Sequence, residues 1–151
     1  RGYQVGLGTG VWWLLALFGG VWGFDTGAFF AGHFFGRHKL APRISPGKTW
    51  EGVFGGLIFS IAAALLFTTL PTLFHWPAPL GVPWYLAVVL GLLVGVAAVL
   101  GDLAESLIKR QTHVKDSGQF FPGHGGALDR IDSLLFAVLV IFIFAQLIGK
   151  V

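Results

Sequence analysis

The chain has 151 residues, of which 55% are hydrophobic and only 11% are charged, and its formal net charge is +3. The mean hydropathy of +0.78 and four long apolar runs exclude an ordinary water-soluble domain and predict an integral membrane protein. Cysteine is absent, which excludes disulfides, a thiolate nucleophile and a cysteine-ligated metal. We expect residues 1–151 to form one membrane domain. Because the chain has no methionine and opens at Arg1, we interpret it as a fragment or a processed product.

Four helices are predicted, over about residues 10–35, 51–70, 84–108 and 131–148. Each is long enough to cross a hydrocarbon core of roughly 30 Å at about 1.5 Å per residue. The predicted fold class is therefore all-α, a polytopic transmembrane bundle of about four spanning helices. Glycines at i,i+4 spacing within these segments indicate close helix packing. Four prolines are expected to break the chain between the second and third helices: Pro71, Pro77, Pro79 and Pro83.

The basic residues predict the orientation in the membrane. Eight of the ten lie in the first and third connections, and the second connection has none. By the positive-inside rule, the first and third connections form two polar cytoplasmic loops. The acidic residues lie in the same loops or in the helix ends beside them. The eight basic residues are Arg37, Lys39, Arg43, Lys48, Lys109, Arg110, Lys115 and Arg130.

Two carboxylate pairs are candidates for a metal site. Asp102 and Glu105 stand three residues apart near the end of the third helix, and Asp129 and Asp132 do so at the start of the fourth. Spacing of i,i+3 places each pair on one helical face, and oxygen-rich sites of this kind suit Mg²⁺. The alternative for Asp129 and Asp132 is that they only cap the fourth helix. Capping does not explain Asp102, which follows an apolar run.

Two further places carry polar residues. Asp25 lies inside the first helix, where an acid is a functional candidate, although a structural hydrogen bond to a neighbouring helix would also explain it. Residues 45–49 place a turn before the second helix, with hydroxyls on Ser45 and Thr49 and a cation on Lys48. This segment is suited to phosphate, but it lacks the spaced glycines of a Walker A loop and reads equally well as a solvated loop.

The densest polar segment, Ser106–Asp132, reads SLIKRQTHVKDSGQFFPGHGGALDRID. Cations beside carboxylates in an otherwise apolar chain suit a metal-bound polyphosphate, and the glycines allow close approach to a ligand. This segment resembles the signature of the phosphatidate cytidylyltransferase family, also called CDP-diacylglycerol synthases. The matching pattern is S-x-x-K-R-x4-K-D-x-G, followed by P-x-H-G-G and D-R-x-D. Further segments match in family order, at residues 25–28, 45–49, 51–52 and 101–106.

The resemblance covers nearly the whole chain and corresponds to the C-terminal half of family members, whose additional N-terminal helices are absent here. Phe29 stands where the family usually has Tyr, and Ala127 replaces a larger aliphatic residue. The resemblance implies that CTP and phosphatidate give CDP-diacylglycerol and pyrophosphate with Mg²⁺, and with room for a second cation. It places the enzyme in the bacterial inner membrane with its site facing the cytoplasm. The partners are CTP, phosphatidate and the bilayer, with no nucleic acid and with a homodimer as the assembly considered.

By the same resemblance, the metal ligands are Asp102, Asp129 and Asp132, and Lys115 joins them as a catalytic residue. The substrate-binding residues are Lys48, Ser45, Thr49, Lys109, Arg110, His124, Arg130 and Asp25. Two other functions stay open at this point. One is a related CTP-using enzyme that acts on an isoprenoid lipid phosphate or a polyprenol. The other is an ion or proton transporter with Asp25 and Asp102 as relays, which would require acids throughout the membrane depth.

Overall fold

A computed structural model describes the backbone of residues 7–76, 80–112 and 127–149, and their side chains except at 7–9, 109, 111–112 and 127–133. The four helices are α1 (Leu7–Phe35), α2 (Trp50–Leu73), α3 (Trp84–Thr112) and α4 (Ala127–Leu147). Strands β1 (Lys39–Ala41) and β2 (Ser45–Thr49) form an antiparallel hairpin between α1 and α2. The all-α prediction is confirmed, with this hairpin as the addition that the sequence did not predict.

The helix bounds follow from local chemistry. Thr49 caps α2, because its hydroxyl accepts the backbone N–H of Gly52 at 3.1 Å. At the other end, α2 continues through Pro71 to Leu73, so the prediction that Pro71 breaks the helix is wrong. Pro71 costs only its own N–H bond to the Phe67 carbonyl, and the helix end is closed by backbone bonds from Phe74 to the Leu70 carbonyl and from Trp76 to the Pro71 carbonyl. His75, with φ of 52°, then ends the segment.

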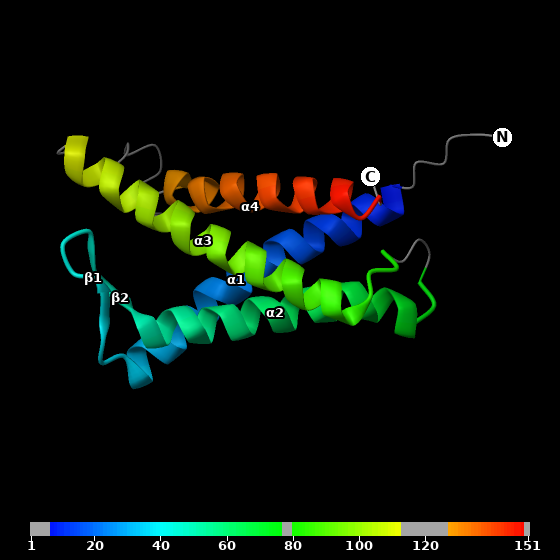
Figure 1. The fold of residues 1–151 in the computed structure, drawn as a ribbon, viewed down its shortest axis with the longest axis horizontal. Coiled ribbons are helices and arrows are strands. Elements are labelled where there is room, and N and C mark those ends of the chain that lie inside the picture. Colours follow the sequence, from blue (N-terminus) through cyan, green and yellow to red (C-terminus); the bar gives the residue numbers. More distant parts are fainter. Residues whose placement is uncertain (1–6, 77–79, 113–126, 150–151) are drawn as a thin grey trace.

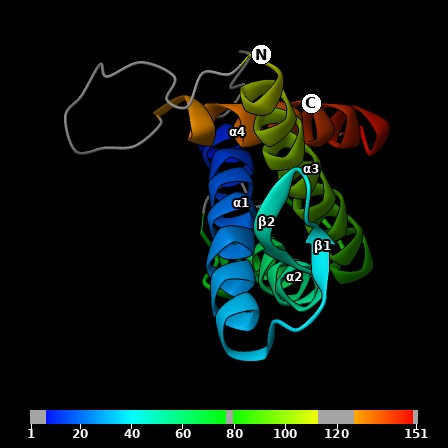
Figure 2. The same ribbon diagram turned by 90° about the vertical axis from the view of Figure 1, so that its left-hand side faces the viewer.

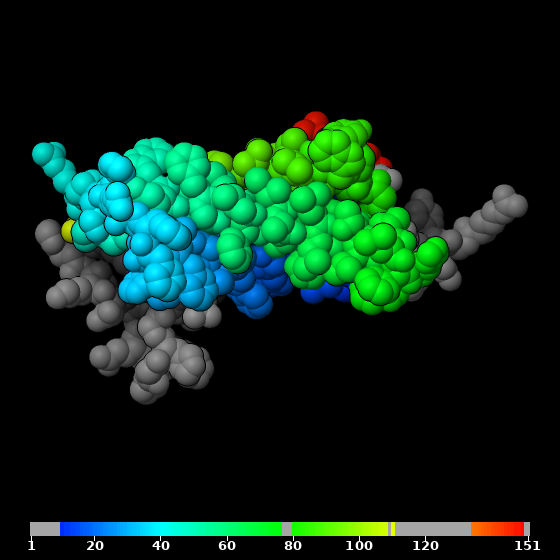
Figure 3. Space-filling view, turned by 90° about the horizontal axis from the view of Figure 1, so that it is seen from below, coloured from blue at the N-terminus to red at the C-terminus, as the bar shows by residue number. Residues whose placement is uncertain are grey.

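Glycines let α1 and α2 approach closely. A Cβ atom added at Gly27 would lie 2.6 Å from the carbonyl oxygen of Gly55, and one at Gly55 would lie 2.3 Å from Cβ of Ala31. The predicted packing role of the glycine series is thus confirmed at this interface. Figure 3 shows α2 lying along α1, with the hairpin at one end of both helices.

The buried core lies between α1, α3 and α4. It is built from Trp13, Leu17 and Val21 of α1, Leu90 and Val94 of α3, and Ile141 and Phe144 of α4. Helix α3 also packs on α2, where the hydroxyl of Ser60 donates to the carbonyl of Gly91 at 2.9 Å in a fully buried position. Large apolar side chains remain exposed along all four helices, as expected for surfaces that face lipid.

Three of the described helices are long and apolar enough to cross a membrane: Gly10–Phe35, Trp50–Leu73 and Trp84–Ile108. A shorter apolar stretch, Leu134–Leu147, belongs to α4. Together they make the chain an integral membrane protein. The hairpin, the end of α3 and the start of α4 lie at one end of the bundle, and the connection from α2 to α3 lies at the other (Figures 1 and 2). Trp12 stacks on Trp76 at this second end, with ring centroids 5.1 Å apart, as in an interfacial aromatic belt.

Candidate functional site

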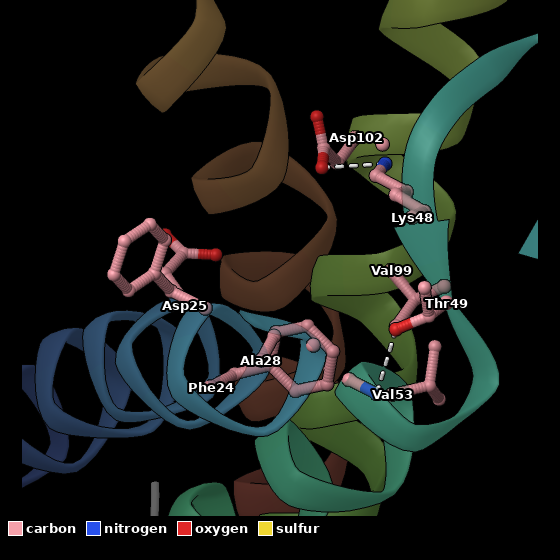
Figure 4. A pocket seen from close by; sticks show the side chains of 12 residues that line it. Phe24, Asp25, Ala28, Lys48, Thr49, Val53, Val99 and Asp102 are labelled. Atoms are coloured by element: carbon pink, nitrogen blue, oxygen red, sulfur yellow. Dashed lines mark hydrogen bonds and ion pairs between the residues drawn. The ribbon is translucent and has the colours of Figure 1, made fainter. Parts of the chain in front are cut away.

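A cavity of about 250 Å³ opens at the end of the bundle that carries the hairpin. Four elements enclose it: α1, β2, the first turn of α2 and α3. Among its walls are four of the polar residues singled out from the sequence, and Figure 4 shows how they enter from different elements. The lining residues are Phe24, Asp25, Ala28, Phe29, Gly32, Gly47, Lys48, Thr49, Gly52, Val53, Val99 and Asp102.

Lys48 and Asp102 form an ion pair across this cavity. Strand β2 carries Lys48 to the end of α3, and its Nζ lies 2.5 Å from Oδ2 of Asp102. The Lys48 side chain is 22% exposed and that of Asp102 is 46% exposed. Lys48 therefore supplies the partner that a carboxylate following an apolar run requires. The Asp102 side chain is also exposed enough for a cation from solution to reach it, as is that of Asp25.

Asp25 and Thr49 form other parts of the wall. Asp25 projects from α1 and Asp102 from α3, so the two acids approach the cavity from different helices (Figure 4). Thr49 contributes its buried side chain, which caps the start of α2. Gly52 lets α2 pack closely on α1 beside the cavity, because a Cβ atom at Gly52 would lie 3.0 Å from the carbonyl oxygen of Ala28.

Sequence reasoning missed the apolar part of the wall. Phe24, Val53 and Val99 line the cavity but carry no chemical group that singles them out in a chain rich in such residues. Gly32 and Gly52 were detectable by their spacing, yet spacing alone indicates only helix packing. The wall therefore combines apolar residues of the helices with polar side chains from α1, β2 and α3.

The hairpin itself is held by contacts beyond its own strands. Nδ1 of His38 lies 2.6 Å from Oε1 of Glu51, and the backbone N–H of His38 donates to both Glu51 oxygens at 3.2 Å. Near the turn, Nε of Arg110 donates to the carbonyl of Ile44 at 2.5 Å. Arg110 is not among the described residues that line the cavity, and its role in substrate binding stays a prediction.

Ser45 begins β2 opposite Ala41, so the segment expected as a turn is a strand, and Ser45 lies away from the described cavity wall. The remaining candidates cannot be placed. Lys115 and His124 lie outside the described residues, as do the side chains of Lys109, Asp129, Arg130 and Asp132. Within the described part, no group of three or more His, Cys, Asp or Glu side chains gathers as a metal site. The backbone of the first turn of α4, which carries Asp129 and Asp132, lies at the same end of the bundle as the cavity.

Comparison with known proteins adds independent information. Residues 3–148 match the model of the cytidylyltransferase family. A phosphatidate cytidylyltransferase of Haemophilus influenzae is 48% identical over 131 residues, which cover 85% of this chain and 44% of that protein. The Brucella suis protein of the same name is 43% identical over 137 residues, covering 91% and 48%. That of Bacillus subtilis is 42% identical over 127 residues, covering 84% and 45%. The chain thus spans slightly less than half the length of these relatives.

Proposed function

The chain belongs to the cytidylyltransferase family, and we propose that it carries the catalytic part of a phosphatidate cytidylyltransferase. The proposed reaction transfers CMP from CTP to phosphatidate and releases pyrophosphate. A phosphate oxygen of the lipid attacks the α-phosphorus of CTP, and the bond between that phosphorus and the bridging oxygen to the β-phosphate breaks. The lipid phosphate is itself the nucleophile, which is consistent with a chain that has no cysteine.

The observation that carries this proposal is the Lys48–Asp102 pair in a cavity at the end of a membrane bundle. A lipid phosphate resides at the membrane surface, and a nucleotide arrives from water, so both can reach this depth. Phosphoryl transfer requires positioning and charge neutralisation more than covalent chemistry. A lysine and two acids that share one cavity supply groups of both required charges.

The proposed roles follow from charge. Lys48 attracts and holds CTP phosphates, and Asp25 and Thr49 position substrate from the cavity wall. Lys115 neutralises charge that develops in the transition state. The other proposed phosphate and lipid contacts, drawn from the family resemblance, are Ser45, Lys109, His124 and Arg130. Arg110 belongs to the same resemblance, but its Nε–H donates to the Ile44 carbonyl, so we do not propose it as a direct contact.

We extend the proposal to Mg²⁺, which Asp102, Asp129 and Asp132 would hold. Hard carboxylate oxygens fit this ion, and a cation already faces Asp102 in the form of the Lys48 ammonium group. When bound, Mg²⁺ would neutralise phosphate charge as a Lewis acid. A second cation at the same carboxylates is part of the proposal.

The proposed location is the bacterial inner membrane, with the cavity facing the cytoplasm. Basic residues in the connections before α2 and after α3 support this orientation, because the hairpin, the end of α3 and the start of α4 lie at the cavity end of the bundle. The proposed partners are CTP, phosphatidate and bilayer lipid, and a homodimer is the proposed assembly.

The test is turnover in membranes that contain the protein. Radiolabelled phosphatidate is incubated with CTP, with and without Mg²⁺, beside a parallel arm that contains an isoprenoid lipid phosphate. We expect a liponucleotide from phosphatidate that requires both CTP and Mg²⁺, and none from membranes with the Asp102→Asn variant. Product from the isoprenoid arm alone would show that the lipid substrate is an isoprenoid phosphate and not phosphatidate. The absence of product in both arms would refute the proposed cytidylyltransferase activity.

A further inference from the structure

The hairpin that carries Lys48 is weak by itself. Strand β1 has three residues and β2 has five, and their register is irregular between Lys39 and Ala41. Strand β2 includes Pro46 and Gly47, which are poor strand formers. Isolated two-stranded hairpins are marginally stable at best in water. The position of Lys48 must therefore depend on contacts from outside the hairpin.

Two anchors provide these contacts. At the base, the Glu51 carboxylate binds the backbone N–H and the ring of His38, and the Trp50 N–H donates to the His38 carbonyl at 3.0 Å. Near the turn, Arg110 reaches from the last turns of α3 to the carbonyl of Ile44, across a separation of 66 residues. The first anchor joins residues that are close in sequence. Of the two anchors, Arg110 is therefore the one that ties the hairpin to α3.

Helix α3 therefore holds the hairpin at two points. One is the Asp102 contact to Lys48, and the other is the Arg110 contact to the Ile44 carbonyl, about two turns further along the helix. Figure 4 shows β2 beside α3, with Lys48 directed at Asp102. When a cation or a phosphate engages either member of the ion pair, the first point is lost. The Arg110 contact then keeps the hairpin in place.

We propose that Arg110 is a positioning residue that holds the hairpin against α3, so that Lys48 stays in the cavity during substrate binding. This inference rests on the proposed function for its effect on CTP, but the clamp itself is a structural claim. A guanidinium Nε–H aimed at a backbone carbonyl is fixed by the geometry of that carbonyl, whereas a direct phosphate ligand would face the cavity. Arg110 then acts on CTP through Lys48.

A crosslinking rescue tests the clamp. Because the chain has no cysteine, Ile44→Cys and Arg110→Cys can be combined and joined by a short bifunctional thiol reagent in membranes. Before crosslinking, we expect the apparent KM for CTP to rise about three- to tenfold with kcat unchanged, the size of one lost hydrogen bond. After crosslinking, KM should return to that of the parent protein. Arg43→Ala is the matched control, since it removes a neighbouring exposed guanidinium without removing the clamp.

Trypsin cleavage after Arg43 gives a readout that needs no turnover. Arg110→Ala should speed this cleavage, and the crosslink should slow it again. Unchanged cleavage in Arg110→Ala, or failure of the two cysteines to crosslink, would overturn the clamp whether or not the protein uses CTP. A crosslinked protein whose KM stays raised would also overturn it, in favour of direct phosphate binding by Arg110. Absence of CTP turnover in the parent protein would instead count against the proposed function, and the cleavage rates would still decide the clamp.

Discussion

At the scale of single residues, the Lys48–Asp102 pair is better suited to chemistry than to stability. The Asp102 side chain is 46% exposed, although the Nζ atom of Lys48 is buried, and ion pairs that solvent screens on one side contribute only about 0–1 kcal/mol to folding. Holding a lysine against an acid at the edge of an apolar bundle therefore needs another explanation. A site that must accept both a cation and a polyphosphate provides one. A cation can take the place of Lys48 beside Asp102, and a phosphate can take the place of Asp102 beside Lys48.

Asp102→Asn keeps the shape of the side chain and removes its charge. We expect turnover to fall by at least about two to three orders of magnitude, the loss typical of a group that stabilises transition-state charge, and the dependence on Mg²⁺ to weaken. The unfolding midpoint in detergent should change little, for the reason given above. Near-normal turnover would contradict the assignment of Asp102. A large loss of stability would indicate a structural role.

Lys48→Ala removes the cation without altering the carboxylate. We expect the apparent KM for CTP to rise with kcat nearly unchanged, because Lys48 attracts the substrate equally in the ground and transition states. Lys115→Ala should instead lower kcat. Steady-state kinetics at varied CTP concentration separates the two patterns, with Arg43→Ala as the control for loss of a nearby positive charge. If Lys48→Ala lowered kcat alone, Lys48 would be the residue that stabilises transition-state charge, and the role proposed for Lys115 would be wrong.

At the scale of elements, sequence patterns predicted the helices well and the hairpin not at all. Long apolar runs determine where helices lie in a membrane, since each buried backbone group must be paired within its own segment. Strand β2 contains Pro46 and Gly47, and its order depends on Glu51 and Arg110, so no local pattern marks it. Pro71 misled in the opposite direction, because a proline removes only one backbone donor and α2 continues for two residues beyond it.

The candidate site also has a part that the sequence predicts and a part that it does not. Scarce charges in an apolar chain identified Asp25, Lys48 and Asp102 as residues to consider, and the structure gathers all three around one cavity. The direct contact of Lys48 with Asp102 was not predictable, since it requires a strand at residues 45–49. The apolar wall was not predictable either, because residues such as Val53 and Val99 resemble every other lipid-facing or core position in composition.

The interface between α2 and α3 offers a prediction about elements. Gly91→Ala would place a Cβ atom 2.5 Å from Cα of Ile61, where only backbone movement can relieve the clash. Overpacking of this kind costs about 1–3 kcal/mol, and it would also strain the Ser60 hydrogen bond to the Gly91 carbonyl. Unfolding in detergent should show this loss. Gly10→Ala is the matched control, because nothing lies within 4 Å of its added Cβ. Equal stability of the two variants would contradict the close packing of α2 and α3.

At the scale of the whole molecule, charge and shape agree on orientation. The hairpin and the end of α3 share one end of the bundle with the cavity, and both of these segments carry basic residues. The opposite end carries the α2–α3 connection, which has no Lys or Arg, together with the stacked Trp12 and Trp76. The excess of positive charge at one end is the feature that orients a membrane protein, and aromatic rings mark a membrane boundary at the other.

This orientation can be measured directly, because the chain has no cysteine of its own. Lys39→Cys lies in the hairpin and His75→Cys lies in the α2–α3 connection, and both positions are exposed. A membrane-impermeant thiol reagent added to intact cells should label His75→Cys and leave Lys39→Cys unlabelled, and inverted membrane vesicles should reverse the result. Labelling after detergent solubilisation controls for reactivity at each position. If both cysteines reacted from the same side, the two ends of the bundle would not face opposite sides of the membrane. A cytoplasmic site for CTP would then lose the argument from charge that supports it.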